Sequence, residues 1–182
     1  WLTTLCHDRP LTFFDHHLRV GNSLVGASLA DVRQREPGRR ASRRPLPLLD
    51  ADGLAAAVGH AVTCRERLRN DLEDTLEQVR AKERLFAELV APGAPLSRWK
   101  AVADLWCAGW FQGRERKVGR AALNALLDEV SGRYTTLAEH VRDELLALGT
   151  SSAQSHGFFH WELEFPEVSH GANGEALPDP GF

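Results

Sequence analysis

Apolar residues recur at helical spacing through the middle of the chain, from about residue 51 to 149. Between Asp50 or Asp52 and Val90 this spacing predicts one long helix, or two helices broken near Gly59. The sequence Ala-Pro-Gly-Ala-Pro then ends the pattern. The apolar stripe of this first segment consists of Leu68, Leu72, Leu76, Val79, Phe86 and Leu89.

Three further helices are expected before residue 150. Ser97 has the residue type of an N-cap for a helix that closes around Gly113. A second helix is predicted from Ala121 to Val130, and a third begins at Thr136, which forms a capping box with Glu139, and stops at Gly149. Residues 51–149 should therefore form a small antiparallel helical bundle. The stripe of the helix at Ser97 holds Trp99, Val102, Ala103, Trp106 and Trp110, which we interpret as core in preference to a base-stacking platform.

Short segments with a two-residue period flank this helical region. Leu18 and Val20 alternate with Arg19 and lead into Gly21, which predicts a short strand that ends in a glycine turn. Near the other end, polar residues alternate with Phe159, Trp161, Leu163 and Phe165, which predicts a half-buried strand stopped by Pro166.

Composition excludes several classes of protein. The net charge of −3 and the pI near 6.3 give no general attraction to nucleic acid or to an anionic membrane. The three cysteines are far apart, and no segment resembles a membrane span or a signal peptide, so a cytoplasmic, non-membrane protein is expected. The chain contains no methionine and begins with Trp1, which we interpret as an internal piece of a longer protein.

Residues 29–50 read as a basic linker, because arginines alternate there with prolines and a glycine. This linker is either a solvated loop or an arm that contacts phosphates through its guanidinium groups. Its arginines are Arg33, Arg35, Arg39, Arg40, Arg43 and Arg44.

Asp15, His16 and His17 are candidate metal ligands, because Asp-His-His is a signature of one class of manganese-dependent phosphoesterases. That class needs further aspartates on separate strands, and no Asp-x-Asp strand precedes the motif here. The helix-spaced pairs His60 with Cys64 and His156 with His160 lack a third ligand nearby. Neither a phosphate-binding loop nor a catalytic serine motif occurs, so the sequence supports neither nucleotide-triphosphate hydrolysis nor nucleophilic catalysis.

Two segments together resemble the N6-adenine DNA methyltransferases of bacterial restriction–modification systems, in particular the large fused type II (IIG-like) enzymes. They are "WLTTL…RPLTFFDHHLRVGNSLVGA" at residues 1–28 and "FHWELEFPEV", which precedes Gly181 and Phe182. In that family an insertion of variable length separates such segments, and a catalytic Asn-Pro-Pro-aromatic motif follows. Val20 stands where a cysteine is common, and Ser169 where an aromatic residue usually follows.

The resemblance implies an α/β fragment that is mainly α in this chain: part of a Rossmann-like core interrupted by a helical-bundle insertion. Residues 1–28 would belong to the core, 29–50 to the linker, 51–149 to the insertion, and 150–182 to the return to the core. Gly21 and Asn22 would then bind the adenine of S-adenosylmethionine at a strand end, and Gly21 and Phe165 would be neighbours.

The resemblance also implies double-stranded DNA as the substrate and a restriction endonuclease, fused or separate, with a specificity domain as partners. We expect Arg39, Arg40, Arg43 and Arg44 to contact DNA. Since the cofactor glycine motif and the catalytic motif are not in these 182 residues, the isolated chain should be inactive. The alternatives are a helical DNA- or protein-interaction module without catalysis and a phosphoesterase of the Asp-His-His type.

Overall fold

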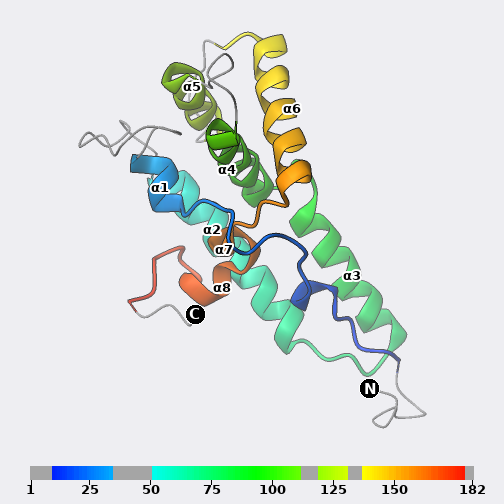
Figure 1. Ribbon diagram of the computed structural model, residues 1–182. Coiled ribbons are helices and arrows are strands. Elements are labelled where there is room, and N and C mark those ends of the chain that lie inside the picture. Colours follow the sequence, from blue (N-terminus) through cyan, green and yellow to red (C-terminus); the bar gives the residue numbers. More distant parts are fainter. Residues whose placement is uncertain (1–9, 35–50, 112–118, 131–136, 179–182) are drawn as a thin grey trace.

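The computed structural model describes residues 10–34, 51–111, 119–130 and 137–178, and this part of the chain is mainly helical (Figure 1). The predicted helical middle is confirmed. The elements are η1 (Asp15–His17), α1 (Leu29–Gln34), α2 (Ala51–Asn70), α3 (Leu76–Val90), α4 (Pro95–Phe111), α5 (Arg120–Val130), α6 (Glu139–His156), α7 (Trp161–Glu164) and α8 (Pro166–Ser169).

Helix α4 is the centre of the fold, since it packs against α1, α2, α3, α5, α6 and α7. Its apolar residues are buried on almost every side, as expected for a helix surrounded by others. The tryptophan stripe is core in part: Trp99 and Trp106 are buried, whereas Trp110 is 50% exposed.

The long segment between residues 51 and 90 forms two helices, but they do not break at Gly59. Gly59 lies inside α2, where a Cβ atom would come within 2.4 Å of the Ala172 carbonyl oxygen, so glycine permits the C-terminal loop to approach. The break falls instead between Asn70 and Leu76. There Thr75 accepts a hydrogen bond from the Gln78 backbone and forms a capping box that the sequence reading missed.

Two predicted helix boundaries are wrong. Helix α4 begins at Pro95, which is favoured in the first helical turn, so Ser97 lies inside the helix. Helix α6 continues through Gly149 to His156, because Gly149 lets the helix approach the backbone of Leu105 closely. The predicted cap at Thr136 lies outside the described residues. The helix predicted from 121 to 130 is confirmed by α5.

The strand predicted across residues 159–165 is wrong. This segment forms two short helices, α7 and α8, in which the backbone N–H of Glu164 donates to the His160 carbonyl at 2.8 Å. The strand predicted at residues 18–20 is also wrong: the described residues of this segment form no strand, and the neighbouring Asn22 makes an isolated parallel bridge with Phe158. A strand needs a neighbour to pair its backbone groups, and a short helix satisfies its own.

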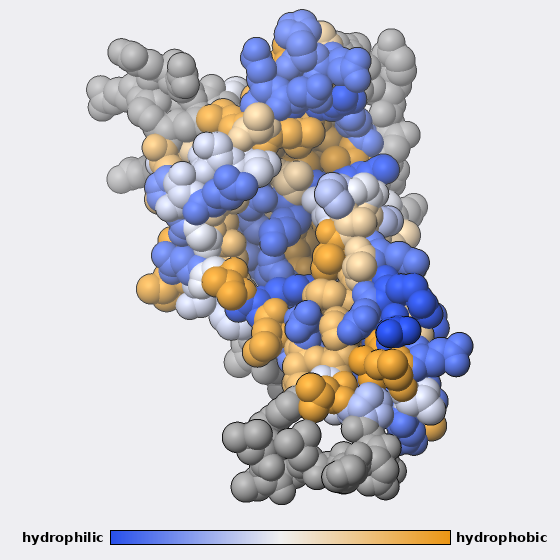
Figure 2. Space-filling view, turned by 90° about the vertical axis from the view of Figure 1, so that its right-hand side faces the viewer, coloured by the Kyte–Doolittle hydropathy of each residue, from blue (hydrophilic) through white to orange (hydrophobic). Residues whose placement is uncertain are grey.

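The surface is mixed in character. The face that Figure 2 presents, over α3 and α6, is hydrophilic at its upper end, and apolar side chains reach the surface in its lower half. Within the described ranges, no helix combines the length and the apolar character needed to cross a bilayer.

Candidate functional site

The two flanking segments meet in space. The backbone N–H of Asn22 donates to the Gly157 carbonyl at 2.5 Å, and the N–H of Phe159 donates to the Val25 carbonyl at 2.8 Å. We refer to residues 18–27 and 157–164, joined in this way, as the junction. The junction includes α7, which packs against α4, and it lies near the middle of the molecule in Figure 1.

Two glycines make the close contact of the junction possible. A Cβ atom on Gly26 would lie 1.9 Å from the Phe159 carbonyl oxygen, and one on Gly21 would lie 2.7 Å from the Phe159 ring. No side chain fits at either distance. The ring against Gly21 is therefore that of Phe159, and the expected neighbour Phe165 lies one ring further, 6.3 Å from the Phe159 centroid.

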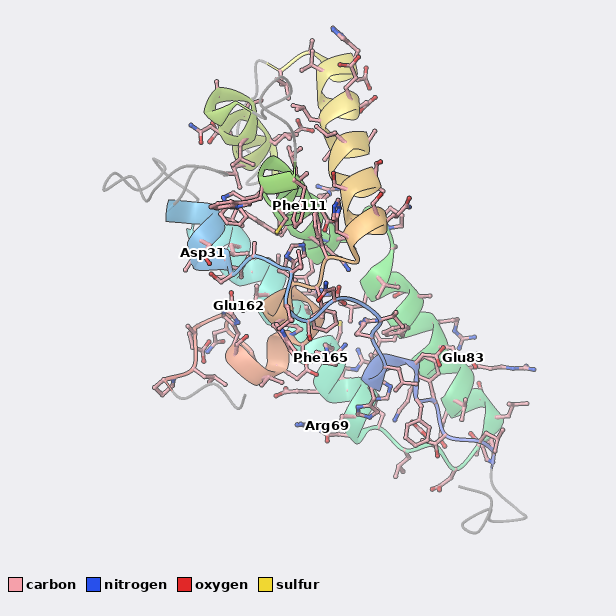
Figure 3. The ribbon with its side chains drawn as sticks, viewed as in Figure 1. Asp31, Arg69, Glu83, Phe111, Glu162 and Phe165 are labelled. Atoms are coloured by element: carbon pink, nitrogen blue, oxygen red, sulfur yellow. The ribbon has the colours of Figure 1, made fainter. Side chains whose placement is uncertain are left out.

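His160 fastens the junction to the helical body. Its side chain is fully buried, and its Nδ1 accepts a hydrogen bond from the Ala27 backbone N–H at 3.0 Å. The proton of the imidazole is therefore on Nε2, which donates to Asp104 of α4 at 2.9 Å. Nearby, Glu162 accepts from the backbone N–H of Leu29 at 3.0 Å and so caps α1; Figure 3 shows Glu162 and α1 on the same side of the molecule. Both side chains hold the two chain segments in register.

Asn22 and Gly21, the two predicted cofactor-binding residues, are exposed at the junction. The Asn22 Oδ1 atom accepts a hydrogen bond from the Leu24 backbone N–H at 3.1 Å, which fixes the carboxamide in a turn. Asn22 thus caps a turn with its side chain. This bond uses one lone pair of Oδ1, so the other lone pair and both Nδ2 protons can still form hydrogen bonds to a ligand.

The outer side of the junction is apolar and exposed. Leu18, Val20 and Leu24 have exposed fractions of 68%, 102% and 92%. They are spaced by two residues or multiples of two, whereas Arg19 between them points back toward the helical body. The segment therefore has the alternation of a strand whose outer face has no cover in the described chain.

A cavity of about 330 Å³ lies between residues 18–20, α3 and α4. Arg19, Arg65 and Lys100 line it together with Glu164. Glu164 pairs with Lys100 and, at 3.1 Å, with Arg19, and Arg65 pairs with Glu167 at 2.5 Å. The carboxylates of Glu164 and Glu167 thus pair with the cations of this cavity. Burial lowers the pKa of Arg19.

The Asp-His-His motif forms the short helix η1. His16 is buried and stacks on Phe13, while His17 is exposed. In the described part of the chain, no three His, Cys, Asp or Glu side chains lie close enough to hold a metal ion. The pairs His60 with Cys64 and His156 with His160 therefore gain no third ligand from the described residues.

An exposed group of aromatic rings beside the junction escaped the sequence reading. Phe111, at the end of α4, packs on His156 at 4.2 Å and on Phe158 at 5.4 Å between ring centroids (Figure 3). Gly157, in the left-handed conformation with φ 66°, ends α6 between His156 and Phe158 and turns the chain there. A glycine between two aromatic residues was the available signal in the sequence.

The predicted DNA-contacting residues Arg39, Arg40, Arg43 and Arg44 lie outside the described residues. The chain matches no protein-family model, and comparisons with curated proteins and with solved structures find no similar one.

Proposed function

We propose that this chain is part of an S-adenosylmethionine-dependent DNA adenine-N6 methyltransferase of a restriction–modification system. The observation that carries the proposal is the hydrogen bond from Asn22 to Gly157. It joins the two segments that resemble this family, although a helical body separates them in the sequence. A helical insertion between two pieces of one core requires this proximity, and unrelated flanks do not.

Asn22 fits the edge of an adenine base. S-adenosylmethionine supplies the methyl group, and the Asn22 carboxamide would orient the cofactor. Its remaining Oδ1 lone pair would accept from the exocyclic amine, and Nδ2 would donate to a ring nitrogen. Gly21, which is exposed and lacks a side chain, leaves room for a ligand to approach the backbone.

The outer apolar face of the junction provides a surface for the rest of the proposed core. Leu18, Val20 and Leu24 present exposed aliphatic side chains at strand spacing. Covering them with neighbouring strands would bury apolar area at about 25 cal/mol per Å². The proposed core sheet would thus lie against these exposed side chains of the junction.

The basic linker supplies the proposed DNA contact outside the catalytic centre. Arg39, Arg40, Arg43 and Arg44 would bind backbone phosphates, which gives affinity without sequence information. Replacing these four arginines by glutamine should weaken DNA binding and reduce its dependence on salt. Unchanged affinity and an unchanged salt slope would contradict this role.

The function is tested with the protein encoded by the complete open reading frame. We expect it to transfer labelled methyl groups from S-adenosylmethionine to N6 of adenine in duplex DNA, and the 182-residue chain alone to transfer none. Asn22→Ala should raise KM for the cofactor by roughly 10-fold, as expected for losing one bidentate base contact. The matched control is Asn70→Ala at the exposed end of α2, which should leave KM unchanged.

Other outcomes would overturn the proposal. Manganese-dependent phosphodiester cleavage without methyl transfer would favour the Asp-His-His phosphoesterase. DNA or protein binding without either reaction would favour the non-catalytic interaction module.

A further inference from the structure

Three aromatic side chains form a group at the end of α4 and α6, which we call the ring platform: Phe111, His156 and Phe158. The rings of His156 and Phe158 are nearly parallel, with 18° between their planes and 5.7 Å between centroids. Phe111 is tilted by 35° to both. Phe111 is 46% exposed and His156 is exposed, whereas Phe158 is 6% exposed and anchors the group.

The rings are held in place before any ligand arrives. His156 Nδ1 donates to the Ser152 carbonyl at 3.0 Å, which fixes the imidazole on α6. The left-handed Gly157 sets the direction of Phe158. Because these side chains are already ordered, a ligand that stacks on them causes little further loss of side-chain entropy.

The platform is connected to Asn22 through a single residue. Gly157, between two of the rings, accepts the backbone hydrogen bond of Asn22, and a Cβ atom on Gly157 would lie 3.7 Å from Asn22 Cβ. Exposed aromatic faces stack on nucleobases of any kind, and an asparagine amide complements the edge of adenine. Both kinds of contact are thus available to one planar ligand.

We infer that Phe111 and His156 form a stacking face for an adenine base whose edge is bound by Asn22. The inference rests on the proposed function only for the source of that base, which is either the cofactor or a DNA nucleotide turned out of the duplex. It assigns a binding role to Phe111 of the helical insertion and to His156 of the segment that returns to the core.

The first test titrates the 182-residue chain with adenosine and observes aromatic and side-chain amide resonances by NMR. Shifts should be centred on Phe111, His156 and Asn22, and uridine should cause smaller ones. Phe111→Leu should weaken adenosine binding by roughly 5- to 100-fold, the range expected for one lost stacking contact. Phe111→Trp should retain it, and Phe14→Leu, a change at a 42% exposed ring on another part of the chain, should have no effect.

Adenosine shifts that are absent, or that are centred away from these residues, would overturn the inference. Equal binding by the Phe111→Leu variant would overturn it as well. Loss of binding in both Phe111→Leu and Phe111→Trp would indicate a packing role and would count against stacking.

The second test identifies the source of the base. S-adenosylhomocysteine and a thymine oligonucleotide with one central adenine are compared as ligands, and the stronger shifts at Phe111 identify the source. The two proposals can fail separately. Methyl transfer by the complete protein without adenosine shifts would overturn the ring platform alone, and adenosine shifts without methyl transfer would overturn the proposed function alone.

Discussion

His160 Nε2 donates to Asp104 Oδ1 at 2.9 Å across 56 residues of sequence, and the histidine is fully buried. The same ring accepts the Ala27 backbone N–H, so one side chain links three separate parts of the chain. A leucine at this position would leave a nearly buried carboxylate and a buried N–H without partners.

We therefore predict that His160→Leu lowers the free energy of unfolding by about 3 kcal/mol. Urea unfolding followed by circular dichroism measures this change. His140→Ala, at an exposed position of α6, is the control and should change stability by less than about 0.5 kcal/mol. A His160→Leu protein as stable as the control would contradict a structural role for this bond.

From the contact between Gly26 and Phe159 we predict that a side chain at position 26 destabilises the fold. Gly26→Ala would place Cβ 1.9 Å from a backbone oxygen, so the two segments of the junction must separate. We expect a loss of about 2 kcal/mol or more in the free energy of unfolding. Gly93→Ala is the matched control, because its Cβ meets nothing within 4 Å. Equal stabilities of the two variants would show that the junction is not closely packed.

His16 predicts a dependence of stability on pH. Burial, assisted by the positive charges of His17, Arg65 and Lys82 and opposed by Glu73, lowers the pKa of His16 from 6.5 to about 4. The unfolded chain therefore binds a proton more readily than the folded chain. The contribution of the neutral, buried His16 to the free energy of unfolding is complete above pH 6.5, and it is lost progressively as the pH falls to about 4.

His16→Phe removes this titration while it keeps a ring against Phe13. Between pH 6.5 and pH 4, the parent chain should lose up to about 3 kcal/mol more stability than the variant, since one pKa unit corresponds to about 1.4 kcal/mol. Unfolding midpoints measured at several pH values provide the comparison. Parallel pH profiles for the two proteins would refute the assignment to His16.

The two described cysteines should be unreactive in the folded chain. Burial, with a smaller effect of Asp104, raises the pKa of Cys107 to about 12, and burial also raises the pKa of Cys64. Because the thiolate is the nucleophile, iodoacetamide at pH 8 should modify Cys107 at least about 100-fold more slowly than after unfolding in urea. Mass spectrometry of the digested protein measures each site separately. Rapid alkylation of Cys107 without urea would contradict its placement in the core.

The sequence predicted those parts of the fold that depend on neighbours three or four residues apart. The helical character of the described residues between 51 and 149 and the bounds of α5 follow from apolar spacing, which is a local property of the chain. The turn predicted at Gly21 is also present, and Asn22 is exposed in it. The predicted helix start at Ser97 was wrong, because proline is favoured in the first turn of α4. The predicted helix end at Gly149 was wrong, because packing of Gly149 against the distant Leu105 outweighs the local capping signal.

What only the tertiary structure decided is how the ends of the helical body meet. The alternation around Phe159 and Leu163 is compatible with a strand, yet the chain forms α7 and α8 there, because the backbone groups find partners within the segment. The ring platform and the His160–Asp104 bond likewise join residues that no local pattern connects. Local spacing predicts the long helices, whereas the contacts that build a site depend on long-range packing, which the periodicity of a single segment does not encode.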